Sequence, residues 1–112
     1  MMCGSELKSL PESVQRVAVA LQAAGHPHGP VMLDDAARTA QQAADALGVG
    51  VGQIAKSIIF RRRSDDAPVL VITSGDRRVD EKKVAALVGK VGRADADFVR
   101  LKTGFAIGGV SP

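Results

Sequence analysis

The spacing of apolar residues changes several times along the chain, and each change marks a predicted element. After Ser9, apolar positions recur at helical spacing at Leu10, Val14, Val17, Leu21 and Ala24. Ser9 with Glu12 fits a capping box, and Gly25 fits a helix end in the left-handed conformation. The pattern therefore predicts an N-terminal helix over about residues 9–25.

Two short β-branched runs predict strands. The first, QIAKSIIF at residues 53–60, reads as a central strand, and the second, VLVIT at residues 69–73, is apolar on both faces. Apolar residues on both faces are typical of a strand that is covered on both sides. The charged segment RRRSDD at residues 61–66 predicts a solvated hairpin link between the two strands, with contact of the three arginines with RNA phosphates as the alternative.

Cap residues and closing glycines predict three more helices. One runs from Ala40 to Leu47 after Thr39 and stops at Gly48, one follows Asp80 and ends at Gly89, and one follows Asp95 and ends at Gly104. Residues 91–93 predict a brief strand, and residues 105–107 a last strand that opens into GGVSP. We expect a single mixed α/β domain over residues 1–112, with a mixed sheet flanked by helices.

Lys56 interrupts the apolar pattern of the first strand. Strand periodicity places it on one face with Ile54, Ile58 and Phe60. A lysine there must be paired, extend its head group to water, or line a cavity that favours a cation, because an unpaired buried ammonium is costly. A solvated lysine at the wet end of the strand is the structural alternative.

Composition narrows the classes of function. Aromatic residues make up 3% of the chain, which leaves few side chains for stacking on bases, and the formal charge of +3 permits a polyanionic partner without requiring one. Cys3 excludes an internal disulfide and fits a reducing compartment. No long apolar span or leader is evident, so we expect a soluble cytoplasmic protein without a membrane partner.

The segment from Gly75 to Asp80 predicts the rim of a site. It joins a strand to a helix, where backbone amides attract anions, although Asp80 fits a plain N-cap equally well. Arg77 and Arg78 are the candidate phosphate contacts, with ordinary surface charge as the alternative. His26 and His28 lie on a Pro/Gly loop without a third ligand, so no metal or other cofactor is expected.

The order of these motifs is more specific than any one of them. The helix from Thr39 to Gly48, QIAKSIIF, VLVITSGDRRVDEKKVA and TGFAIGGVSP together resemble the YbaK-type, prolyl-tRNA-synthetase-associated editing family, from about Val31 to Pro112. The resemblance implies a domain that hydrolyses the ester of a mischarged tRNA, most simply a tRNA(Pro) carrying Cys or Ala.

The resemblance also assigns residues. It implies that Lys56 lies in the substrate pocket and is needed for activity. Gly75 and Asp76 are expected to border the substrate because they lie on the strand-to-helix rim described above. The resemblance further implies that the loop Gly108, Gly109, Val110, Ser111 and Pro112 binds the aminoacyl ester through backbone amides. A Cβ at Gly108 or Gly109 would obstruct close approach or a positive φ. Mischarged tRNA is the implied partner, with an aminoacyl-tRNA synthetase as a second one.

Family members continue beyond this loop, so a chain that stops at Pro112 is expected to be C-terminally truncated or to hold an incomplete site. The nucleophile is expected to be a positioned water or a group on the substrate, because neither Ser57 nor Ser111 has a His or Cys nearby in sequence. The rival hypothesis is a non-catalytic module that binds the tRNA end or a synthetase. A nucleotide or phosphate enzyme that uses residues 75–80 lacks Walker or dinucleotide spacing.

Overall fold

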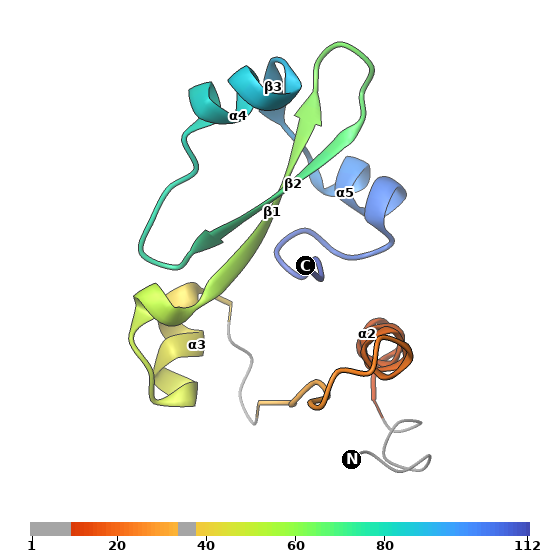
Figure 1. Ribbon diagram of the computed structural model, residues 1–112, viewed down its shortest axis with the longest axis vertical. Helices are drawn as coiled ribbons and strands as arrows, with labels where there is room; N and C mark the ends of the chain where they lie inside the picture. The colour runs from red at the N-terminus through yellow and green to blue at the C-terminus, as the bar shows by residue number, and fades with distance from the viewer. Residues whose placement is uncertain (1–9, 34–37) are drawn as a thin grey trace. The chain divides into compact units, whose positions relative to one another are not determined.

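The computed structural model describes residues 10–33 and 38–112 of the chain. The chain forms two compact units, unit 1 (Met1–Asp34) and unit 2 (Asp35–Pro112). The predicted single domain over residues 1–112 stays a prediction. Figure 1 shows the helix of unit 1 and the sheet of unit 2 with its helices.

Unit 1 is built around helix α2 (Glu12–Ala23). The predicted start at Ser9 is wrong: the N-cap residue is Pro11, with φ −54° and ψ 150° and no side-chain cap. A proline disfavours helical backbone at the residue before it, here Leu10, so the helix begins only after the proline. Ser9 itself lies outside the described residues. The predicted end is confirmed, because Gly25 has φ +74° and its amide donates to the Gln22 carbonyl at 3.0 Å.

Unit 2 contains a three-stranded antiparallel sheet in the order β2-β1-β3, formed by β1 (Ala55–Arg62), β2 (Pro68–Ser74) and β3 (Val91–Arg93). The prediction that the lysine-bearing strand is central is confirmed. The strand begins two residues later than predicted, because a 3-10 turn, η1 (Val51–Gln53), precedes it. The Gln53 side chain accepts the Gly50 amide at 2.9 Å and closes that turn.

A charged hairpin joins β1 to β2, as predicted. Arg61 pairs with Asp66 at 2.6 Å, and Arg62 pairs with Asp65 at 2.7 Å. The hydrogen bond from Arg62 is the main reason that the pKa of Asp65 is lowered to about 2. Both pairs are exposed, so they balance charge at the turn and contribute little stability.

The described part of unit 2 has three α-helices: α3 (Ala40–Leu47) contacts η1, whereas α4 (Glu81–Val88) contacts β3 and α5 (Ala96–Thr103) contacts β2 of the sheet. Their predicted caps are confirmed. Thr39 forms a capping box with Gln42, and the carboxylates of Asp80 and Asp95 accept amides of the first turns of α4 and α5. The mixed α+β class is confirmed as well. Within residues 10–33 and 38–112, no helix has the length and hydrophobicity to cross a membrane.

The prediction that β2 is covered on both faces is wrong. Leu70 and Ile72 are 42% and 47% exposed, whereas Val69 and Val71 on the other face are half-buried. β2 is an edge strand of an antiparallel sheet, and such sheets can leave one face to solvent. Apolar side chains on both faces therefore do not reveal which face is packed.

The chain after α5 is not the predicted strand. The Thr103 hydroxyl accepts the Phe105 amide at 3.0 Å, and the Gly109 amide donates to the Ala106 carbonyl at 2.9 Å. These two bonds fold residues 103–109 into consecutive turns and remove the extended backbone that strand pairing needs. The residues from Gly104 to Pro112 form a loop beside the sheet.

The contact between η1 and the end of β2 generates a stability prediction. A Cβ at Gly75 would clash with the Val51 carbonyl oxygen and lie 3.0 Å from Ala40 Cβ. We expect Gly75→Ala to lower the free energy of unfolding by about 1–3 kcal/mol, the usual cost of overpacking. Gly50→Ala is the control, because its Cβ would come no closer than 3.6 Å to the Gln53 side chain. Urea denaturation measures both, and equal stability of the two variants would contradict the packing argument.

Candidate functional site

Lys56 lies on the central strand with a half-buried side chain. Its register partner on β2 is Thr73, and Ile58 pairs with Val71 on the same face. The ammonium Nζ donates to the Arg77 carbonyl oxygen at 3.0 Å. Among the described residues, no carboxylate lies within ion-pair distance of it. One carbonyl uses one of three N–H donors, so two donors remain for a ligand.

The loop that receives this hydrogen bond is tightly built. The Gly75 amide donates to the Ile54 carbonyl at 2.7 Å, and the Arg77 amide donates to the Ser74 carbonyl at 3.1 Å. Only glycine fits at position 75, as the contact with Val51 shows. The loop is thereby held against the start of β1, directly beside Lys56. We call Lys56, Ser74, Gly75, Asp76 and Arg77 the Lys56 corner.

Asp76 supplies the negative charge of the Lys56 corner. The Ser74 hydroxyl donates to its carboxylate at 2.6 Å. This hydrogen bond is the main cause of a lowered pKa of Asp76, and the positive charges of Arg77 and Lys56 lower it further. Asp76 is therefore ionised at neutral pH and balances the lysine without a direct ion pair.

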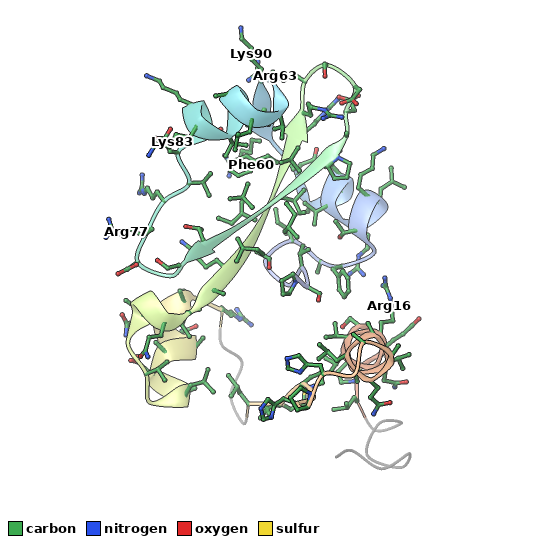
Figure 2. The ribbon with its side chains drawn as sticks, in the orientation of Figure 1. Arg16, Phe60, Arg63, Arg77, Lys83 and Lys90 are labelled. Carbon is green, nitrogen blue, oxygen red and sulfur yellow. The ribbon has the colours of Figure 1, made fainter. Side chains whose placement is uncertain are left out.

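Arg77 and Arg78 are both exposed. The Arg77 guanidinium is 80% exposed and lies 4.0 Å from the Asp76 carboxylate, and Figure 2 shows it directed away from the sheet. Asp80, by contrast, acts as the N-cap of α4: its carboxylate accepts the amides of Lys82 and Lys83 at 3.1 and 3.2 Å. The amides of Lys82 and Lys83 are thus occupied by Asp80, whereas Arg77 and Arg78 present exposed cationic side chains to an anion.

A pocket of about 390 Å³ lies in unit 2 along the edge of β1. Its walls come from β1, the start of α4, the end of β3 and the terminal loop: Ser57, Ile58, Ile59, Phe60, Glu81, Arg93, Ala94, Ile107, Gly108 and Val110. Side chains of consecutive strand residues point to opposite faces of a sheet, so a pocket that is lined by four consecutive residues lies at the edge of the strand. β3 pairs with β1 from Phe60 to Arg62 only, so the preceding residues keep an edge for this pocket.

The two glycines of the terminal loop differ in role. Gly108 has φ +81°, which other residues rarely adopt, whereas Gly109 does not have a positive φ and its Cβ would make an ordinary 3.5 Å contact with the Ala106 carbonyl oxygen. The expected conformational need for glycine thus holds at Gly108 and not at Gly109. The Gly109 amide is used within its turn, whereas the amides of Gly108 and Val110 meet no acceptor among the described residues.

The candidate residues therefore fall into two adjoining groups. Lys56, Gly75, Asp76 and Arg77 meet at the Lys56 corner, and Gly108 and Val110 line the pocket, which begins at the next strand residue, Ser57. Gly109, Ser111, Pro112 and Lys56 itself are not among the pocket-lining residues.

Sequence reasoning missed Glu81 and Arg93, the charged residues of the pocket wall. Glu81 is the first residue of α4 and Arg93 is the last residue of β3, so each reads as an ordinary surface charge. Their meeting depends on how α4 packs against β3, which no spacing in the sequence encodes. Ser57 was considered as a nucleophile but not as a pocket residue.

A larger cavity of about 640 Å³ lies within unit 1, around Gly25, His26, Pro27, His28 and Gly29. His26 Nδ1 accepts the His28 amide at 3.1 Å, so this ring stabilises its own loop. In the described part of the chain, no three His, Cys, Asp or Glu side chains are grouped to hold a metal ion. The cavity in unit 1 has no charged lining residue, and we place the candidate site in unit 2.

Comparison with known proteins decides the family. The family model of the aminoacyl-tRNA editing domain matches residues 34–112, which include the Lys56 corner and the pocket along the edge of β1. The chain belongs to the aminoacyl-tRNA editing domain family. Both groups of site residues thus lie within the editing domain, and helix α2 lies before it.

The chain is also similar to individual proteins. The chain is 39% identical over 75 residues to the uncharacterized protein YwhH of Bacillus subtilis (strain 168), over 66% of this chain and 47% of YwhH. A proposed trans-editing enzyme for prolyl tRNA synthetase is 43% identical in sequence with a TM-score of 0.81, over 91% of this chain and 65% of that one. The hypothetical protein APE2540 is 31% identical with a TM-score of 0.79, over 87% and 65%. The chain spans about half the length of the curated relative and about two thirds of these structures.

The charge state of the Lys56 corner can be tested directly. Ser74→Ala removes the hydrogen bond that contributes most to the lowered pKa of Asp76, so this pKa should rise toward its ordinary value. Arg77→Ala should raise it less, because its charge is a smaller cause. NMR titration of the Asp76 carboxyl carbon measures both shifts. Because the folded state lowers the pKa of Asp76, this carboxylate stabilises the fold at pH values above the ordinary pKa of an aspartate. That stabilisation is lost as the pH falls through the folded-state pKa. An unchanged pKa in Ser74→Ala would contradict this description.

Proposed function

We propose that this editing domain is a deacylase that hydrolyses the ester between a wrongly attached amino acid and the 3′ end of a tRNA. The observation that carries the proposal is the open edge of β1, where an apolar pocket with unused backbone amides lies next to a half-buried lysine. The family and the prolyl-tRNA-synthetase relative support the same reaction.

The pocket suits a small aminoacyl group. Its volume of about 390 Å³ lies in the range of small-molecule sites, and its walls are mainly aliphatic. The carboxylate of Glu81 can receive the α-ammonium group, and Arg93 can bind the phosphate of the terminal nucleotide. We propose Cys or Ala on tRNA(Pro) as the substrate: the pocket has room for a small aminoacyl group, and the relative described as a trans-editing enzyme for prolyl tRNA synthetase supports a proline tRNA.

Hydrolysis needs a nucleophile and a stabilised oxyanion. A water attacks the ester carbonyl carbon, the carbonyl oxygen becomes an oxyanion, and the bond to the ribose oxygen then breaks. The proton lost by the water ends on the ribose oxygen, which gives a free tRNA end and a free amino acid. The amides of Gly108 and Val110 can donate to the oxyanion, because no described protein acceptor occupies them.

Lys56 is proposed to bring positive charge to this reaction. It keeps two N–H donors beyond the one that binds Arg77, and Asp76 holds the local charge near neutrality. No histidine or cysteine that could activate Ser57 is among the residues that line the pocket. A positioned water, or a thiol of the substrate itself, is therefore the proposed nucleophile.

A binding module without catalysis is the second candidate. It is favoured by one observation: Lys56 is directed to the Arg77 carbonyl and is not among the pocket-lining residues. Such a module would bind the tRNA end, or a synthetase, with the same pocket. Single-turnover deacylation of tRNA charged with Ala, Cys, Pro or Ser separates the two, because the module binds the RNA and leaves every ester intact.

Lys56→Ala should lower the single-turnover deacylation rate about 10²- to 10³-fold, the usual effect of removing one donor to an oxyanion. Lys102→Ala is the matched control, because this exposed lysine lies on α5 and approaches Phe98 rather than the site. Thermal unfolding of both variants checks the fold. A Lys56→Ala variant that folds normally and keeps the wild-type rate would overturn the catalytic role of the lysine.

The terminal loop gives a second matched pair. Gly108→Ala forces a Cβ onto a backbone with φ +81°, at a cost of about 1–2 kcal/mol, so the loop should shift and deacylation should fall roughly tenfold. Gly109→Ala should keep most of the rate, because its Cβ makes only an ordinary contact. The same assay measures both variants. A larger loss at Gly109 than at Gly108 would refute the assignment of the loop amides.

A further inference from the structure

Unit 2 carries a row of exposed cations that starts at Arg77 of the Lys56 corner and continues outside the corner and the pocket. The row begins at Arg77 after β2, follows α4 and ends at the hairpin, where Figure 2 draws Lys83, Arg63 and Lys90 on the side of the unit that carries α4. We call it the α4 strip, and its exposed members are Arg63, Arg77, Arg78, Lys82, Lys83 and Lys90.

A backbone hydrogen bond joins the last two members of the strip, Lys90 and Arg63. The Arg63 amide donates to the Lys90 carbonyl at 2.9 Å, which places the hairpin beside the link from α4 to β3. α4 has eight residues and is about 12 Å long, so the strip extends over more than one nucleotide repeat.

Arg63 differs from the two arginines before it. Arg61 and Arg62 are paired with Asp66 and Asp65. The guanidinium of Arg63 instead lies against Gly92, where an added Cβ would come within 3.1 Å of its Nε. In the described residues no carboxylate is within ion-pair distance of Arg63, so the hairpin presents one uncompensated positive charge, on the β3 side.

The acids near the strip offset only part of its charge, with the Asp76 carboxylate 4.0 Å from the Arg77 guanidinium. Between Asp76 and Arg93 the chain has six basic and three acidic residues. Asp76 accepts from Ser74, Asp80 caps α4, and Glu81 lines the pocket. On the other side of the unit, the segment from Asp95 to Lys102 is balanced, with two acidic and two basic residues. The positive charge is therefore concentrated along α4.

We propose that the α4 strip binds the phosphate backbone of an RNA duplex, namely the stem next to the tRNA 3′ end; the choice of RNA rests on the proposed function. Six cations without an aromatic side chain among them suit backbone phosphates rather than unpaired bases, whose binding depends on stacking. The strip starts at Arg77 of the Lys56 corner, so a stem that lies along α4 would have its end near the lysine.

The test uses uncharged RNA, so that it does not depend on deacylation. Binding of the 112-residue chain to a fluorescent 12-base-pair RNA hairpin is measured by anisotropy at several salt concentrations, with a single-stranded RNA of equal length as the second probe. Lys83→Ala with Lys90→Ala removes two charges from the strip. Arg100→Ala with Lys102→Ala removes two charges from α5 and is the matched control.

The strip variant should bind the hairpin at least about fivefold more weakly at 0.1 M salt, and the slope of log K against log salt should fall by about 1 to 2. The control should retain most of the affinity, and the hairpin should bind more tightly than the single strand. Equal losses in both variants would show that net charge alone matters, and tighter binding of the single strand would show that no duplex is recognised. Either result overturns the proposal.

The failure of this inference is distinguishable from failure of the proposed function. If the strip variant loses hairpin binding and the wild-type chain hydrolyses none of the esters, the RNA-binding surface is supported and the deacylase is refuted. The opposite result is that deacylation depends on Lys56, whereas the strip variant changes neither KM nor the affinity for the hairpin. This result would support the deacylase and refute RNA binding by the α4 strip.

Discussion

The hydrogen bond from Lys56 to the Arg77 carbonyl is the interaction on which the candidate site depends. It ties the middle of unit 2, the central strand, to the loop that leaves β2. The loop can come this close only because residue 75 has no Cβ and packs against η1. A cation on a half-buried face is tolerated here because a carbonyl and a nearby carboxylate replace part of its hydration.

The second constraint is the shortness of β3. It pairs with only the last three residues of β1, and the remaining strand edge faces the loop that follows α5. Backbone groups at a strand edge need partners, and among the described residues those of this edge border a pocket rather than another strand. The apolar wall, the two loop amides, and the charges of Glu81 and Arg93 meet at that edge. The amino-acid site that we propose is thus a consequence of the sheet topology.

Much of the fold could be predicted from local chemistry. Helix starts could be predicted at Thr39, Asp80 and Asp95 because a capping side chain acts on backbone amides within three residues. Lys56 could be singled out because strand periodicity alone places it on an apolar face. The wrong predictions have different causes. The helix begins after Pro11, because the proline disfavours helical backbone before it. Residues 105–107 have the composition of a strand, but the Thr103 hydroxyl folds them into a turn. Which face of β2 is exposed depends on the elements that pack against the sheet. Glu81 and Arg93 reach one pocket only through the packing of α4 on β3.

The most direct test of the account is to locate the aminoacyl group on the protein. Backbone NMR spectra would be recorded while an unhydrolysable analogue, alanine joined by an amide to the 3′ position of adenosine, is added. The account predicts shifts at Ser57 to Phe60, at Gly108 and Val110, and at Glu81 and Arg93, the residues that line the β1 edge. Shifts confined to Gly25 to Gly29, around the larger cavity of unit 1, would contradict it and move the site out of the editing domain.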